Sequence, residues 1–156
     1  MNKILFSLLK LSSLIAISCS TSKTTNSQSM QQQGIEGYVY RISGNQMPSP
    51  DAKPSQPRGI KTVLYIYQLT NLNQVQRQGQ SAFYYSIRTN YVAKVESDSV
   101  GHFKINLPSG KYSLFAKKDD LFFANSFDKD NNIFPTEVLP EKFSKVEFRI
   151  DYDASY

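Results

Sequence analysis

Three oxygen-bearing side chains alternate in the segment DKDNN, at a spacing that could serve a metal ion. Asp128, Asp130 and Asn132 are two residues apart, and a hard cation such as Ca²⁺ prefers several oxygens that converge from one tight turn. However, Ile133 stands where a calcium loop needs glycine, and Leu139 takes the twelfth position in place of glutamate. We predict a solvated turn, with the three residues kept as candidates for weak calcium binding.

His102 is the only histidine of the chain, and it is the natural candidate for a general base. It follows the turn SDSVG, and alternation places it on the outward face of the next strand. The sequence contains no GxSxG nucleophile motif, although the many serines and aspartates leave a Ser-His-Asp triad open. We predict a solvated histidine, a protein that is not an enzyme, and no cofactor.

Aromatic residues offer a third kind of chemistry, because the chain has ten tyrosines and ten phenylalanines. Tyr84, Tyr85 and Tyr91 lie near the Gln- and Asn-rich segment 71–81. Stacked tyrosines next to amides can hold sugar rings, so these three are candidate ligand-binding residues. The alternative is that they fill the core and rims of a β-sheet protein, and the sequence favours that interpretation.

The N-terminus has the order of an export signal. Lys3 and Lys10 come first, an apolar run from Leu11 to Ile17 follows, and the small residue Ser18 precedes Cys19. The run is too short to cross a bilayer, which takes about 20 residues. We therefore expect residues 1–18 to be a signal peptide and not a lasting membrane span.

Cys19 is the only cysteine, and its position after Ala16, Ile17 and Ser18 resembles the lipobox of bacterial lipoproteins. The resemblance implies a diacylglycerol on the Cys19 thiol and cleavage before it, so that the lipid joins the protein to a membrane. The alternative is an incidental cysteine inside an ordinary signal peptide. A lone cysteine forms no internal disulfide, so the stability of the fold must come from its core.

The remaining 138 residues suit one domain. Without Lys3 and Lys10, 16 basic residues face 13 acidic ones, and the resulting formal charge of +3 is scattered along the chain. This pattern gives no support to nucleic-acid binding. Residues 19–33 are nearly free of apolar side chains and are predicted to be a flexible tether. The domain is predicted over residues 34–156.

Several short segments of the domain carry strand patterns and none shows helical periodicity. Residues 34–42, 61–69, 83–97, 102–107, 111–118, 121–127 and 144–152 are predicted to contain strands. In the last of these, Val146, Phe148, Ile150 and Tyr152 alternate with charged residues. We expect an all-β fold, an antiparallel sandwich or barrel.

Two turns organise the middle of the chain. SDSVG at 97–101 and Pro-Ser-Gly at 108–110 flank the strand 102–107, which predicts a hairpin that runs back through 111–118. The proline-rich segment 43–59 and the polar segment 71–81 are predicted to be irregular loops. Because long loops on a rigid scaffold commonly carry recognition, any binding is expected there.

The order of these pieces resembles the carboxypeptidase regulatory-like domain. GYVY at 37–40, TVLYIY at 62–67, the turn-strand-turn segment 96–114 and the closing VEFRIDY carry the resemblance, with Gly101, Phe103 and Tyr112 among the matching positions. It covers about 34–152 and implies a seven-stranded, prealbumin-like, Ig-like antiparallel β-sandwich. Residues 43–59 are longer than the family's usual connection, and Val100 also departs from its pattern.

The resemblance also bears on function. Related sandwiches include hydroxyisourate hydrolases and intradiol dioxygenases, which use several histidines, whereas this chain has His102 alone. Small lipid-anchored proteins of this kind resemble those of Bacteroidota envelopes, which implies an outer-membrane location facing the periplasm. We expect a structural or interaction module with an envelope protein or a glycan as its partner. A carbohydrate-binding accessory lipoprotein is the alternative, and a transthyretin-like envelope hydrolase is a third.

Overall fold

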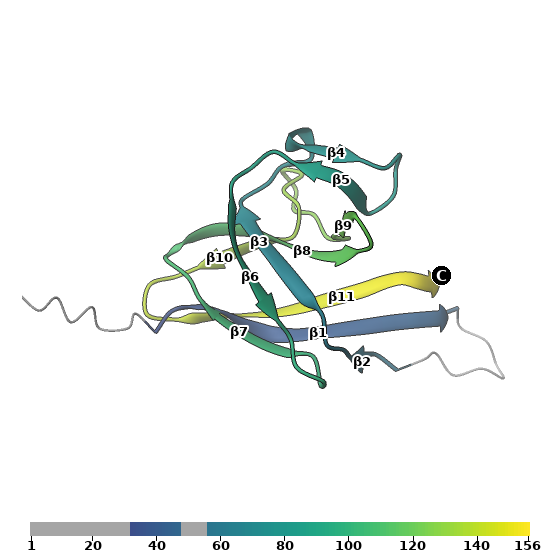
Figure 1. Cartoon of the computed structure of the whole chain (residues 1–156), viewed down its shortest axis with the longest axis horizontal. Coiled ribbons are helices and arrows are strands. Elements are labelled where there is room, and N and C mark those ends of the chain that lie inside the picture. Colours follow the sequence, from purple (N-terminus) through teal and green to yellow (C-terminus); the bar gives the residue numbers. More distant parts are fainter. Residues whose placement is uncertain (1–31, 48–55) are drawn as a thin grey trace, which may run out of the picture.

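The computed structural model describes residues 32–47 and 56–156, which form two packed β-sheets without an α-helix (Figure 1). A single turn of 3₁₀-helix, η1 (Leu72–Gln74), is the only helical element in these ranges. No helix in the described part is long and apolar enough to cross a membrane. The strands are β1 (Gly34–Asn45), β2 (Arg58–Gly59), β3 (Val63–Gln68), β4 (Val75–Arg77), β5 (Phe83–Ile87), β6 (Tyr91–Glu96), β7 (His102–Asn106), β8 (Gly110–Lys118), β9 (Leu121–Phe123), β10 (Pro135–Val138) and β11 (Phe143–Ser155).

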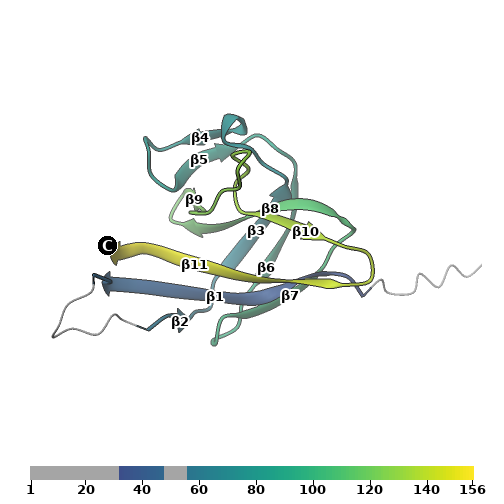
Figure 2. The same cartoon turned by 180° about the vertical axis from the view of Figure 1, so that it is seen from behind.

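The small sheet is built around β1. One edge of β1 pairs with β11 from Gly34 opposite Phe143 to Asn45 opposite Ser155. Its other edge pairs antiparallel with β7 and then with β2. Figures 1 and 2 show β1 and β11 side by side with their arrowheads at the same end. The first and last strands of the domain therefore form one ladder.

The large sheet has the strand order β4-β5-β9-β8-β3-β6, and β10 also pairs with β8. The long strand β8 pairs with β10 through Gly110–Ser113 and with β9 through Ala116–Lys118, while its other edge pairs with β3. Figures 1 and 2 show β4 and β5 at the end of this sheet that is farthest from β1.

The core fills the space between the two sheets, as the alternation of each strand requires. Its members are aliphatic or aromatic and almost fully buried. They include Ile35, Val39 and Phe148 from the small sheet and Leu64, Ile66 and Leu114 from the large sheet. Each such side chain stabilises the folded state by about 1.5–3 kcal/mol through removal of apolar surface from water.

The other face of the large sheet carries a second apolar layer. Phe115 of β8 lies at its centre and makes edge-on ring contacts with Tyr84 at 5.9 Å, Tyr67 at 5.7 Å and Phe122 at 6.2 Å. Tyr84 and Phe115 are both fully buried. The large sheet is thus covered by apolar side chains on both of its faces around β8.

The all-β, two-sheet architecture is confirmed, but the predicted antiparallel, seven-strand arrangement is wrong. The described residues form eleven strands, in sheets of four and seven, and β1 and β11 run parallel. A parallel pair joins segments far apart in the chain. Here those segments are its two ends, which no local turn signal connects.

The predicted hairpin across 97–118 is also wrong, although its strands exist. β6, β7 and β8 follow one another in the chain, but β7 pairs with β1 in the small sheet while β6 and β8 pair with β3 in the large sheet. The turns at 97–101 and 108–110 are therefore corners through which the chain crosses between sheets. Asp98 shapes the first corner, since its Oδ1 accepts hydrogen bonds from the amides of Val100 and His102.

Two predicted loops contain more structure than expected. Segment 71–81 holds η1 and β4, in which Val75 is buried. In segment 43–59, β1 extends to Asn45 and β2 forms before residue 60, while residues 48–55 lie outside the described ranges. The sequence pattern does not predict strand β10, because the segment PTEV has too little alternation of apolar and polar residues to indicate a strand.

Gln33 was assigned to the tether, but it belongs to the domain. Its side chain is 1% exposed, donates to the carbonyl oxygen of Leu107 at 3.2 Å and accepts from the amide of Glu141 at 3.1 Å. It therefore links the β7–β8 corner to the segment before β11. Buried polar groups are stable only when bonded in this way.

Gly101 is predicted to be essential to the first corner. Its φ is +86°, and a Cβ there would collide with the carbonyl oxygen of Val39. Gly79 is the matched control, because its φ is +57° but a Cβ would meet nothing within 4 Å. In urea unfolding we expect a loss of about 3 kcal/mol or more for Gly101→Ala and about 1 kcal/mol for Gly79→Ala. Equal losses would show that no close approach exists.

Burial of Tyr84 in the second layer makes the stability of the protein depend on pH in alkaline solution. Burial raises its pKa from 10.0 to about 12, and its hydroxyl donates to the carbonyl oxygen of Ala124 at 3.2 Å. The unfolded chain ionises first, so the stability that Tyr84 contributes is complete below pH 10 and is lost as the pH rises towards 12.

We expect Tyr84→Phe to lower the free energy of unfolding by about 1 kcal/mol at pH 7, through loss of the hydrogen bond. The difference in free energy of unfolding between the native chain and the variant should narrow above pH 10. The native chain loses stability as Tyr84 ionises, whereas the variant has no ionisable group at position 84. Urea unfolding at several pH values measures it. A difference that stays constant would place Tyr84 in contact with water.

Candidate functional site

His102 lies on the outward face of β7, as predicted, but it is half-buried. Its imidazole packs edge-on against the ring of Tyr38 on β1, with 5.3 Å between ring centres. The two rings border a depression of about 490 Å³ over β1 and β11. No carboxylate or hydroxyl in the described ranges bonds to the imidazole, so the surroundings of His102 are those of a packed surface side chain.

The charged side chains around this depression pair mainly with one another. Glu36 lies 3.3 Å from the amino group of Lys104 and 4.0 Å from that of Lys145, and Glu147 lies 3.3 Å from Arg149. Exposed pairs of this kind contribute about 0–1 kcal/mol each. Each carboxylate on this face therefore has a basic partner, with three cations facing two carboxylates.

The candidate calcium loop is held by hydrogen bonds of its own. Oδ1 of Asp128 accepts from the amides of Asp130 at 2.9 Å and Asn132 at 2.8 Å, and Oδ2 accepts from Nδ2 of Asn132 at 2.8 Å. These bonds keep the pKa of Asp128 below its usual range. In 32–47 and 56–156 no three His, Cys, Asp or Glu side chains are placed to hold a metal. The loop has the geometry of a self-bonded turn.

The three predicted tyrosines do not form one site. Tyr84 is 0% exposed inside the second apolar layer, so its assignment as a surface ligand-binding residue is wrong. Tyr85 is 50% exposed, and its neighbour position on β5 directs it to the opposite face from Tyr84. Tyr91 is 52% exposed and contacts a different tyrosine, Tyr67. Cys19, the predicted lipidation site, lies outside the described residues.

Tyr91 is part of an aromatic group that we call the tyrosine surface, made of Tyr65, Tyr67, Tyr91 and Phe122. Tyr67 lies 5.7 Å from Tyr91 and 5.8 Å from Phe122, and Tyr65 lies 5.7 Å from Phe122, all edge-on. Three different strands supply these rings, β3, β6 and β9. The group covers the outer side of Phe115, whose burial holds it in place.

Polar groups border the tyrosine surface. Nδ2 of Asn90 donates to Oε1 of Gln68 at 3.3 Å, but Gln68 directly follows Tyr67 on β3, so its side chain leaves the opposite face of that strand. Lys117 lies over the ring of Phe122, at 5.7 Å from its centre. Burial and the neighbouring tyrosines raise the pKa of Tyr67, so its hydroxyl stays protonated in neutral solution. The surface thus combines ring faces, hydroxyls and the amino group of Lys117, which are groups that bind apolar and polar parts of one ligand.

Sequence reasoning found Tyr91 but missed Tyr65 and Tyr67. It predicts a strand over 61–69, in which Leu64 and Ile66 are fully buried while the two tyrosines are only partly buried. The available signal was the alternation of aliphatic with tyrosine residues in VLYIYQ. Because a tyrosine has an apolar body and a polar tip, such a strand can have one face in the core and the other at the surface.

Comparisons of the chain with protein-family models, with curated proteins and with solved structures gave no match. The candidate site therefore stands on the geometry of this chain alone. That geometry brings together Tyr65, Tyr67, Tyr91 and Phe122 on one face of the large sheet.

Proposed function

We propose that this protein is a non-enzymatic, lipid-anchored module of a bacterial cell envelope that engages its partner through the tyrosine surface. The observation that carries the proposal is the aromatic group itself, in which the exposed ring of Tyr91 packs on Tyr67 above the buried Phe115. Tyrosine is favoured at interfaces because it offers a large contact area at low entropic cost. A rigid sheet holds these rings without a rearrangement on binding.

The anchor in this proposal is a diacylglycerol on Cys19. The basic, apolar and small order of residues 1–18 supports it. The residues between Cys19 and Gln33 would separate the domain from the membrane. The residues after Cys19 are not acidic and so lack the surface-export signal of some Bacteroidota lipoproteins, which supports a location at the outer membrane facing the periplasm.

We also propose a relationship to the carboxypeptidase regulatory-like domains. The turn residues Gly101 and Gly110 and the strand residues Phe103 and Tyr112 support it by their order and spacing. Two packed sheets agree with that class at the level of architecture. The parallel pairing of β1 with β11 and the strand number differ from the pattern that the resemblance implies.

A carbohydrate is the second candidate partner. The observation that favours it is the exposed ring of Tyr91 packed on Tyr67, two rings that both carry a hydroxyl. Sugar rings present an apolar face that stacks on aromatic rings and hydroxyls that bond to polar groups. A protein partner would use the same rings, so an experiment must separate the two classes.

The anchor is tested by Cys19→Ala in cells that process lipoproteins, with Ser20→Ala as the control. We expect the native chain and the control to carry a diacylglycerol by mass spectrometry and to fractionate with membranes. Cys19→Ala should lack the lipid and lose membrane association, because the thiol is the only acceptor. An acylated, membrane-bound Cys19→Ala chain would contradict the anchor.

The role of the tyrosine surface is tested by Tyr91→Ser, with Tyr38→Ser as the matched control on the other sheet. Both side chains are exposed, at 52% and 42%, so neither change should unfold the protein. After crosslinking in cells, we expect the yield of a co-isolated partner protein to fall at least about tenfold with Tyr91→Ser. This is the effect expected when a binding hot spot is removed. Tyr38→Ser should retain it.

A glycan array with the same two variants separates the candidates. Signal on a glycan that is lost with Tyr91→Ser and kept with Tyr38→Ser would favour carbohydrate over protein. If both variants behave like the native chain in both assays, the tyrosine surface is not the recognition site.

A further inference from the structure

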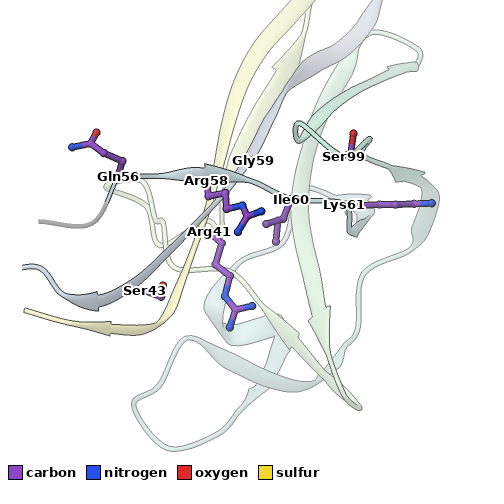
Figure 3. Close-up of a pocket in the computed structure, with 8 residues that line it drawn as sticks. All are labelled: Arg41, Ser43, Gln56, Arg58, Gly59, Ile60, Lys61 and Ser99. Atoms are coloured by element: carbon purple, nitrogen blue, oxygen red, sulfur yellow. The ribbon is translucent and has the colours of Figure 1, made fainter.

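Two arginines face each other directly across the small sheet. Arg41 of β1 and Arg58 of β2 are partners in the antiparallel register, so their side chains leave the same side of the two strands. Figure 3 shows the guanidinium group of Arg58 beside Ile60 and that of Arg41 directed away from it, and the Arg41 guanidinium is the one that pairs with Asp153. Like charges directly opposite each other destabilise a sheet, which makes this pairing costly unless something negative lies beside it.

The described residues neutralise only part of this charge. Asp153 pairs with Arg41 and also lies 3.8 Å from Lys118, so one carboxylate serves two cations. Arg58 makes no ion pair with any residue in the described ranges. Lys61, two residues before β3, pairs with Glu96 at 3.1 Å. Four cations thus surround two carboxylates, a local surplus of positive charge.

Three of these cations, Arg41, Arg58 and Lys61, border an open depression of about 500 Å³. It lies where the chain leaves β2 in the small sheet and crosses to β3 in the large sheet through Ile60 and Lys61. Ser43 and Ser99 contribute to its lining, the latter from the corner at 97–101. In Figure 3, Lys61 and Gln56 extend away from the arginine pair, which leaves the two guanidinium groups as the centre of the positive charge.

We propose that this depression binds an oxyanion of the phosphate type, with Arg58 as its principal ligand and Arg41 as the second. A guanidinium group offers a planar fork of donors that matches phosphate oxygens in a bidentate manner. A phosphate bound at Arg58 and Arg41 would add negative charge where the carboxylate of Asp153 already serves two cations. This site lies apart from the tyrosine surface, so it does not depend on the proposed function.

The first test uses inorganic phosphate and the full chain kept unacylated by Cys19→Ala. Titration at constant ionic strength, followed by NMR of the arginine side-chain Nε–H signals, should give a saturable shift of Arg58 and Arg41. Arg58→Gln should weaken binding at least about tenfold, the loss expected when charge-assisted hydrogen bonds are removed. The matched control Arg149→Gln, which removes an exposed arginine on β11, should bind as before.

The second test distinguishes a lipid headgroup from a soluble phosphate. Vesicles of phosphatidylcholine with or without phosphatidylglycerol are floated with the unacylated chain and with its Arg58→Gln and Arg149→Gln variants. Flotation that needs phosphatidylglycerol and Arg58 identifies a headgroup as the source, whereas phosphate binding without flotation identifies a soluble one.

The proposal is overturned if neither probe binds in a way that depends on Arg58. NMR shifts of the arginine signals that rise with phosphate without saturation would show ordinary screening of exposed charge. Phosphate binding that is equal in Arg58→Gln and Arg149→Gln would show the same. The backbone amide spectrum of Arg58→Gln verifies that the variant remains folded.

Discussion

The double burial of β8 is the constraint on which the rest of this structure depends. Tyr112, Ser113, Leu114, Phe115 and Ala116 are consecutive and all buried, so both faces of this strand lie against other atoms. Leu114 and Ala116 fill the core between the sheets, while Phe115 supports the aromatic layer on the opposite side. One strand thereby joins the packing of the core to the position of the tyrosine surface.

This arrangement explains how a small domain can present a rigid aromatic surface. Each ring of the tyrosine surface contacts another ring edge-on, the geometry that aromatic pairs prefer. Phe115 below Tyr67 is fully buried, so a displacement of Tyr67 would open a cavity in a close-packed region. The surface therefore remains in place without flexible loops. The proposed recognition through a sheet face differs from the binding by loops 43–59 and 71–81 that the sequence predicts.

The sequence predicts the elements of this fold better than their partners. The alternation around Phe103 and across 144–152 identifies strands because one face of each is apolar. The partners of β7 and β11 depend on contacts between distant residues, and glycine- or proline-containing turns look alike in a hairpin and in a corner between sheets. For the site, Phe83, Tyr84 and Tyr85 are aromatic in succession, so alternation cannot show which of them is buried. The arginine pair Arg41 and Arg58 is likewise visible only through the register of β1 with β2.

The claim that the tyrosine surface is the recognition face is tested most directly by positional photo-crosslinking in living cells. A photoreactive phenylalanine would replace Tyr91, Tyr85 or Tyr38 one at a time, since all three are exposed and lie on different faces or sheets. The account predicts a discrete crosslinked species from position 91 and none from position 38. A discrete species from position 38 with none from position 91 would contradict it.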